Sequence, residues 1–208
     1  TATSAHQIER CWIYLMKGTG YSYLKTFNNC RTNRQCAKAK RLSLYVHYDT
    51  DNRISTEDLE TIRTLSSFMD DVFVMSNSDL SHEEIRKATA LGANITVQKR
   101  ENIGMDFGAW RDSLLQLGKE KVQQYDEVIL CNNSFFSPVF PLEEMFAEME
   151  SRHPDFWGNT LFPRLEDGSY IHKDYIPEHL QSYWIVFSKI VTRNEAIARS
   201  EERRVGKE

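Results

Sequence analysis

The sequence lacks the features of a membrane-spanning, secreted or nucleic-acid-binding protein. Its apolar runs fall short of the about 18 to 20 residues that a bilayer-spanning helix needs, and no signal-peptide pattern opens the chain. The 26 Lys and Arg residues are outnumbered by 30 Asp and Glu residues, which leaves a net charge of −4 and no basic stripe for nucleic acid. We therefore expect a cytoplasmic protein with no transmembrane segment and no nucleic-acid partner.

Cysteines and common catalytic motifs are also scarce or missing. The four cysteines are Cys11, Cys30, Cys36 and Cys131, and no two have CxxC spacing, so reduced structural thiols are favoured over a disulfide or a zinc site. No GxGxxG follows the first predicted strand, and neither GxSxG nor HExxH occurs. These absences argue against a dinucleotide-binding dehydrogenase, a serine hydrolase and a zinc protease.

The length and composition are those of one globular domain with short additions. Of the 208 residues, 40% are hydrophobic and 12% aromatic, enough for one sizeable core. Residues 1–40 are expected to be a helical or irregular N-terminal segment at the end of a preceding region, with one short helix over 8–16. The main domain is expected over 41–198. Residues 199–208 lose all apolar periodicity and are interpreted as a non-native or disordered tail.

Strand and helix signals alternate along the main domain. Strands are predicted at 42–48, 72–75, 94–98, 128–131, 155–162 and 181–187. Capping boxes at Ser55 and Ser81 start two helices, and Pro141 precedes a further one. This alternation predicts an α/β fold, in which a mostly parallel sheet of about six strands has helices on both faces, giving three layers.

The segment 99–138 is the expected floor of a site. Its helix has Phe107, Trp110, Leu114 and Leu117 on one face and ends at Gly118. Polar residues follow the predicted strands on either side of this helix and also follow the first two strands. Because ligands of open α/β sheets bind beyond the carboxyl ends of strands, we expect a binding site there.

Several motifs in this order resemble the rhamnan synthesis protein F family, a group that builds bacterial rhamnose-containing polysaccharides. They are LYVHYD, FVMSN, ENIGMDFGAW, YDEVILCNNSFFSPVFPLEEMF, DFWG and HLQSYWIVF, which together extend from Leu42 to about Lys189. The resemblance implies a GT-A, Rossmann-like nucleotide-sugar fold. It also implies an inverting transfer of rhamnose from a nucleoside-diphosphate donor, dTDP-rhamnose, to a polysaccharide or lipid-linked acceptor, with the protein peripheral to the inner membrane face.

The resemblance also implies positions for the donor. The residues expected to bind the nucleotide-sugar are Tyr48, Asp49, Asn77, Asn102, Gly104, Asp106, Asn132, Asn133, Ser134, Gln181 and Ser182. Asp106 has two interpretations, as the N-cap of a helix that starts at Phe107 and as an acceptor for a sugar or ribose hydroxyl. For the charge of the leaving diphosphate, Lys99, Arg100, Arg164 and Lys173 are candidates, each weighed against being a solvated surface charge.

Metal binding and base catalysis are expected at two further places. Many GT-A enzymes hold Mg or Mn with an Asp-x-Asp at the end of the fourth strand, and Asn133 stands at the middle position that the resemblance assigns to a carboxylate. A hard cation prefers carboxylate oxygen, so the amide weakens such a site. Candidates for the general base are His179, Glu178 and Asp174.

A second hypothesis comes from the same departure at the fourth strand. Without the carboxylate, the chain can be a non-catalytic sugar- or nucleotide-binding module of a larger polysaccharide-assembly protein.

Trp110 and Trp184 lie in apolar periodic patterns and are interpreted as core residues rather than sugar-stacking platforms.

Overall fold

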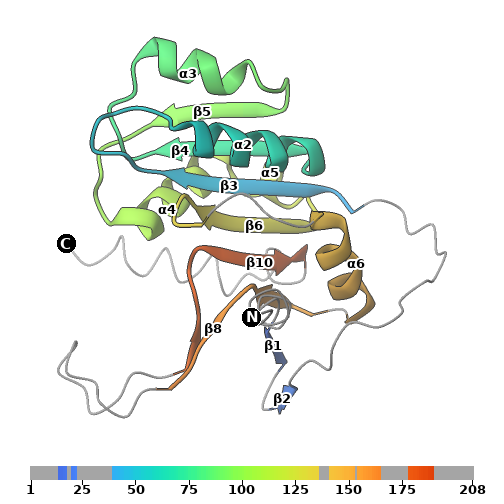
Figure 1. The fold of residues 1–208 in the computed structure, drawn as a ribbon. Coiled ribbons are helices and arrows are strands. Elements are labelled where there is room, and N and C mark those ends of the chain that lie inside the picture. Colours follow the sequence, from blue (N-terminus) through green and yellow to red (C-terminus); the bar gives the residue numbers. More distant parts are fainter. Residues whose placement is uncertain are drawn as a thin grey trace, which may run out of the picture.

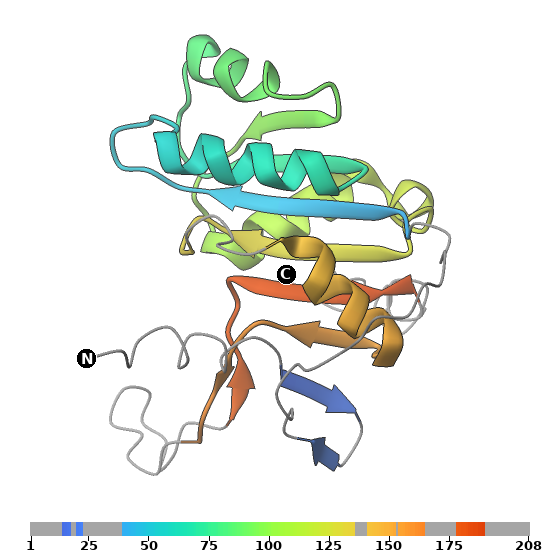
Figure 2. The same ribbon diagram turned by 45° about the vertical axis from the view of Figure 1, so that its right-hand side comes forward.

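The computed structural model is an α/β protein whose main sheet has eight strands in the order β2-β1-β7-β10-β6-β3-β4-β5 (Figure 1). It describes residues 14–17, 20–22, 39–135, 141–152, 154–164 and 178–189. Helices cover both faces of the sheet, as two views of the ribbon show (Figures 1 and 2). The α/β class and the three-layer arrangement predicted from the sequence are therefore confirmed.

Four neighbouring strands form the parallel half of the sheet. They are β3 (Arg41–His47), β4 (Asp71–Ser76), β5 (Ile95–Lys99) and β6 (Glu127–Asn132). The strand β3 pairs in parallel with both β4 and β6, and β4 pairs in parallel with β5. All four carboxyl ends therefore lie at one edge, on the left of Figure 1.

The other half of the sheet is antiparallel. The strand β10 (Trp184–Ser188) pairs with β6 and with β7 (Phe156–Gly158), and β1 (Tyr14–Lys17) joins β7 to β2 (Gly20–Ser22). The short helix predicted over 8–16 is wrong for its last part, since Leu15 and Met16 lie in β1. Backbone pairing to the edge of β7 determines the structure there instead of the apolar spacing.

The predicted strand 155–162 is also corrected. It divides into β7 and β8 (Leu161–Phe162), and β8 pairs with β9 (His179–Leu180) in a separate two-stranded ribbon. The apolar run continues through the break, so periodicity alone could not place it. Because β7 runs antiparallel to β10, which runs antiparallel to β6, the ribbon leaves the main sheet at the same edge as the carboxyl ends of the parallel strands.

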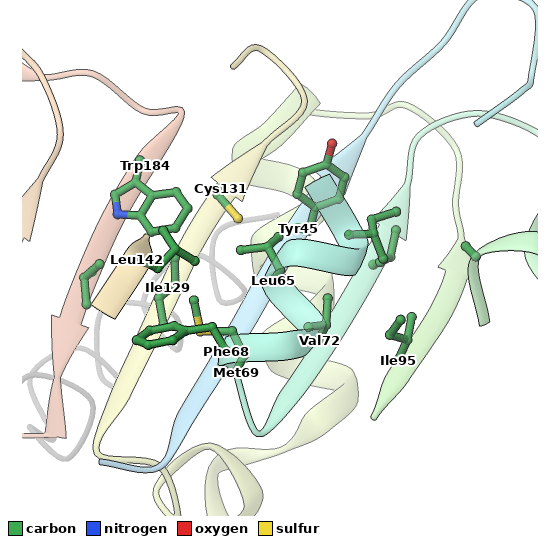
Figure 3. Close-up of a cluster of buried hydrophobic side chains, with 14 of the residues drawn as sticks. Tyr45, Leu65, Phe68, Met69, Val72, Ile95, Ile129, Cys131, Leu142 and Trp184 are labelled. Carbon is green, nitrogen blue, oxygen red and sulfur yellow. The ribbon is translucent and has the colours of Figure 1, made fainter. Parts of the chain in front are cut away.

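The helices form the outer layers. On one face lie α2 (Thr56–Phe68), α3 (His82–Thr89) and α6 (Leu142–Arg152), and on the other lie α4 (Met105–Leu117) and α5 (Lys119–Val122). Each face has its own buried apolar cluster. Figure 3 shows the larger cluster, which includes side chains from β3, β6, β10 and α2. None of the helices in the described segments has the length and apolarity required to cross a bilayer.

Local sequence signals account for most helix ends. Ser55 and Ser81 are the N-caps of α2 and α3, and each hydroxyl accepts a hydrogen bond from a backbone N–H three residues on. The C-cap of α4 is Gly118, whose φ of 77° lies in the left-handed region that glycine tolerates. The helix α3 ends before Gly92, at the C-cap Ala90.

The start of α4 differs from the prediction. The helix begins at Met105 with Gly104 as N-cap, so Asp106 is inside the first turn and is not the N-cap. Phe107 is 69% exposed, although it shares the helical spacing of the buried Trp110. The first turn lies at the sheet edge, so a residue there can have core periodicity without a core to pack against.

Buried aromatic and sulfur side chains pack in the core, as expected for Trp110, Trp184 and Cys131. Trp110 donates from its indole nitrogen to the carbonyl oxygens of Leu44 and Cys131, and Trp184 and Trp157 are both 1% exposed. Cys131 is a buried free thiol, and burial raises its pKa to about 12. Both observations favour packing over ligand contact for these residues.

The amino end of β3 carries a buried ion-pair cluster. Arg41 donates to Glu127 Oε2 and to Glu150 Oε1, each at 2.6 Å, and its guanidinium lies over the rings of Phe68 and Phe146. Burial raises the pKa of Glu127 even though Arg41 opposes the shift. The cluster joins β3, β6 and α6 at the edge opposite the polar strand ends.

This geometry predicts a large stability loss for Arg41→Met, because Glu127 would keep a buried charge without its partner. We expect the free energy of unfolding to fall by about 3 kcal/mol, measured by urea denaturation at neutral pH. The matched control is Arg63→Met, which breaks an exposed pair with Glu60 and should cost no more than about 0.5 kcal/mol. Equal losses in the two variants would contradict the assignment of Arg41.

Candidate functional site

The parallel strands create a topological switch point between β3 and β6. From β3 the chain moves outward through β4 to β5, and then crosses back to place β6 on the other side of β3. The connections after β3 and β6 therefore diverge, and open α/β sheets bind their ligands beyond the carboxyl ends of the strands at such a point. The residues after these two strands are the strongest candidates for ligand contacts.

The turn after β3 is held by its own polar groups. The Asp49 carboxylate accepts hydrogen bonds from the backbone N–H groups of Asp51 and Arg53, at 2.8 and 3.2 Å. The Ser78 hydroxyl contacts both the N–H and the carbonyl of Asp49. Asp49 thus shapes the turn, while the neighbouring Tyr48 is exposed at the strand end.

The turn after β6 is joined to the β3 end. Asn133 donates from Nδ2 to the carbonyl of Tyr48 at 2.9 Å, and its backbone N–H bonds to the carbonyl of Val46. Asn132 Oδ1 accepts from the backbone N–H of Ser134. The asparagines at this strand end therefore act as donors and acceptors that close the turn across the switch point.

Asp106 connects α4 to the same place. Its Oδ2 accepts a hydrogen bond from Asn132 Nδ2 at 2.6 Å. Asn132 is buried and Asp106 is half-buried, so Asp106 is the more exposed partner of this pair. Four of the residues expected from the sequence to bind the nucleotide-sugar come together through these contacts. They are Tyr48, Asp106, Asn132 and Asn133.

Asn77 and the loop before α4 form the adjacent part of the edge. Asn77 is buried, accepts from Arg100 on its Oδ1 and directs its Nδ2 toward the carbonyl of Met105 at 3.4 Å. Asn102 and Gly104 lie in the exposed loop between β5 and α4.

The basic residues at the end of β5 have protein partners. Lys99 bonds to the exposed Asp79 and to the carbonyl of Leu80, and Arg100 pairs with Asp112 at 2.7 Å. These contacts favour a structural role for both over neutralisation of a diphosphate. Arg164 is exposed at the end of its described segment, and Lys173 lies outside the described residues.

The residues expected near the acceptor lie on a different element. His179 is exposed on β9, where its ring stacks on Phe162 with centroids 5.1 Å apart, and Glu178 directly precedes it. Gln181 donates its backbone N–H to the carbonyl of Thr160. The ribbon containing these residues leaves the sheet at the carboxyl edge of the parallel strands.

Ser182 and Asp174 are the two remaining site residues expected from the sequence. Ser182 lies in the turn that leads into β10, at the carboxyl end of β6, because Trp184 pairs with Cys131. Asp174 lies outside the described residues.

The side chains at the end of β6 do not form a dedicated metal site. Within the part of the chain that the structure describes, no three His, Cys, Asp or Glu side chains gather closely enough to hold a metal ion. Asn133, where the resemblance places a cation, uses its amide as a donor to Tyr48, and the Asp106 carboxylate already accepts from Asn132. A hard cation requires several oxygen ligands, which these side chains do not supply.

A buried polar network beneath the turn after β3 was not predicted from the sequence. His47 is fully buried, with Nδ1 2.9 Å from Ser76 Oγ and Nε2 3.6 Å from Asp58 Oδ2. Asp58 also accepts from the hydroxyls of Tyr45 and Ser55. The period of two along β3 puts His47 on the same face as Tyr45, so strand alternation was the signal that could have located it.

Burial lowers the pKa of His47 from its ordinary 6.5, and the nearby Asp58 only partly opposes this. The folded protein therefore favours the neutral His47 ring. At any pH between the lowered pKa of the folded state and 6.5, the unfolded chain binds more protons at this residue. It follows that the free energy of unfolding decreases as the pH falls below 6.5, until the pH passes the lowered folded value.

We predict that His47→Asn loses less stability than the parent protein when the pH is lowered from about 7 to about 5, measured by urea denaturation at each pH. His82→Asn, which changes an exposed histidine at the start of α3, is the control and should keep the parent's pH dependence. The same pH dependence in the His47 variant and the parent would show that the ring does not contribute.

Comparisons with known proteins identify the family of the chain. The family model described as rhamnan synthesis protein F matches residues 72–200, and no curated protein sequence matches the chain. Among solved structures, the chain is similar to core-mannan synthase A from Aspergillus fumigatus in its Mn/GDP form. The identity is 9% and the TM-score 0.38, over 94% of this chain and 78% of that one.

The family match covers more than half of the chain. It begins in β4 and extends past β10, so it includes the polar ends of β4, β5 and β6 and the turn that leads into β10. The chain therefore belongs to the rhamnan synthesis protein F family.

Proposed function

We propose that the chain is a glycosyltransferase that transfers rhamnose from a nucleoside-diphosphate sugar, dTDP-rhamnose, to a growing cell-surface polysaccharide. The observation that carries this proposal is the convergence of Tyr48, Asn132, Asn133 and Asp106 at the β3/β6 switch point in a member of this family. Switch points of parallel sheets are where α/β folds bind nucleotides.

Each part of the donor has a chemically suitable partner at this edge. The exposed ring of Tyr48 can stack on a nucleobase, since aromatic faces tolerate any base. The free side of the Asp106 carboxylate can accept a ribose or sugar hydroxyl while Asn132 holds its other oxygen. Together they would orient the donor with its diphosphate across the switch point.

The transfer itself requires an acceptor hydroxyl to attack the anomeric carbon of rhamnose. In an inverting reaction, the new C–O bond forms on the face opposite the departing diphosphate, and a base removes the hydroxyl proton. Glu178 and His179 are proposed for that role, because β9 extends from the same edge of the sheet. Asp174 is proposed as a further candidate.

A non-catalytic binding module is the second candidate function. It is favoured by the amides at the end of β6, since Asn133 serves as a tether to Tyr48 and provides no carboxylate for a cation on the diphosphate. Under this alternative the switch point binds a nucleotide or sugar without turnover. Release of dTDP from dTDP-rhamnose by the purified chain would distinguish the enzyme from the module.

The binding part of the proposal is tested by isothermal titration of the full chain with dTDP, UDP and GDP, each with and without Mg or Mn. We expect saturable binding of dTDP. Asp106→Ala should weaken it by about tenfold or more, because a hydrogen bond to a charged group contributes about 1.5 to 3 kcal/mol. Glu60→Ala removes an exposed carboxylate on α2 and is the control, with unchanged affinity expected.

Asp106→Ala should lower the thermal midpoint, because it leaves the buried Asn132 amide without its acceptor. The titrations are therefore run well below the midpoint of each variant, so that a loss of affinity reports the site and not unfolding. If none of the three nucleotides bound the parent, the donor-site assignment would be wrong. Binding that Asp106→Ala left unchanged would place the nucleotide elsewhere. A metal dependence of the affinity would show that the nucleotide itself completes a cation site that the side chains alone do not form.

A further inference from the structure

Arg100 connects three separate elements at the edge of the candidate site. Its Nε donates to Asp112 Oδ2 on α4 at 2.7 Å, its Nη1 to Asn77 Oδ1 after β4 at 2.7 Å, and its Nη2 to the carbonyl of Ile103 at 2.8 Å. The side chain is only 13% exposed. A planar guanidinium is the side-chain group that can serve three acceptors in fixed directions at once.

The loop held by Arg100 has an unfavourable backbone conformation. Gly104 has a φ of 76° and the next residue, Met105, a φ of 51°, so two successive residues are left-handed and one of them is not glycine. A non-glycine residue in this region is disfavoured, because its Cβ crowds the neighbouring carbonyl oxygen. The turn therefore needs contacts from outside itself to persist.

The loop packs closely against the first turns of α4. The carbonyl oxygen of Ile103 lies over Gly108 in α4, where a Cβ would come within 2.1 Å of that oxygen and 3.3 Å of Arg100 Nη2. The amide of Gly108 bonds to the carbonyl of Gly104. Arg100 thus fixes the Ile103 carbonyl at the place where α4 begins.

The same contacts determine where Asp106 lies. Because Arg100 occupies Asn77 Oδ1, the Asn77 amide directs its Nδ2 toward the carbonyl of Met105, the residue just before Asp106. From the other side, Asn132 holds the Asp106 carboxylate. The left-handed turn is therefore stabilised from β4 through Arg100 and Asn77, and from β6 through Asn132.

We propose that Arg100 is a positioning residue for the donor site, which holds the turn at Ile103–Asp106 so that Asp106 meets Asn132 at the switch point. Arg100 acts through Asn77 and the Ile103 carbonyl and does not itself contact the diphosphate. The part of this inference that concerns ligand affinity rests on the proposed function.

The test compares Arg100→Lys, Arg100→Gln and the control Arg63→Lys, which alters an exposed arginine on α2. Lysine keeps the charge but not the planar three-way geometry. We expect both Arg100 variants to weaken dTDP binding to a similar extent, about tenfold, and the control to leave it unchanged. Retained affinity in Arg100→Lys with loss in Arg100→Gln would instead show direct charge contact with the diphosphate and overturn the proposal.

Amide hydrogen exchange provides a measurement that is independent of any ligand. In Arg100→Lys, exchange of the Gly108 amide should accelerate by about tenfold or more, while the amides of β3 and β4 exchange as in the parent. Uniformly faster exchange across the sheet would mean a general structural role and contradict the inference. Unchanged exchange at Gly108 would contradict it as well.

A double-mutant cycle with Asn77→Ala completes the design. If Arg100 acts through Asn77, the losses of dTDP affinity in the two single variants should not add in the double variant. Additive losses would separate the two residues and overturn the proposed route. Failure of the parent to bind dTDP, UDP or GDP contradicts the proposed function, whereas normal dTDP binding by Arg100→Lys contradicts only the role of Arg100.

Discussion

The strand β3 is the constraint on which the rest of the molecule depends. All seven of its residues are buried, and it pairs in parallel with β4 on one side and β6 on the other. Because its backbone is satisfied by two parallel neighbours and its side chains by both helix layers, its register fixes the register of the whole parallel half. The switch point at its carboxyl end is a consequence of this central position.

The buried polar groups at the two ends of β3 have different kinds of partner. At the amino end, Arg41 donates to two carboxylates and packs on aromatic rings, so one cation is shared between Glu127 and Glu150. At the carboxyl end, His47 and Asp58 support the turn from below, while Asn133 ties it to β6 from the side. The charged groups at the amino end are therefore paired within the protein. At the carboxyl end, the half-buried Asp106 and the exposed Tyr48 can contact a ligand.

Much of this arrangement could be predicted from local sequence signals. The caps at Ser55 and Ser81 and the apolar strand of β6 depend on neighbouring residues, and the structure confirms them. Residues with tertiary partners were harder. The chemistry of Arg100 suggests a phosphate contact, but the fold brings Asn77, which follows β4, and Asp112 of α4 to its guanidinium, in addition to the nearby Ile103 carbonyl.

Other misses have equally specific causes. Helical spacing identifies the face of α4 on which Phe107 lies, but it cannot show that the first turn lies at the sheet edge. Apolar content likewise cannot show that the chain leaves the main sheet between β7 and β8, because the same residue types pack in both elements. The candidate site was therefore predictable as an edge of the sheet, and its hydrogen-bond network was not.

The most direct test of the central claim is a map of backbone amide chemical shifts during titration of the isotope-labelled full chain with dTDP. Binding at the switch point predicts that the perturbed amides cluster at the turns after β3 and β6 and at the start of α4. Perturbations centred on the opposite edge, around Arg41 and Glu127, or the absence of any localised change at saturating nucleotide, would contradict the claim.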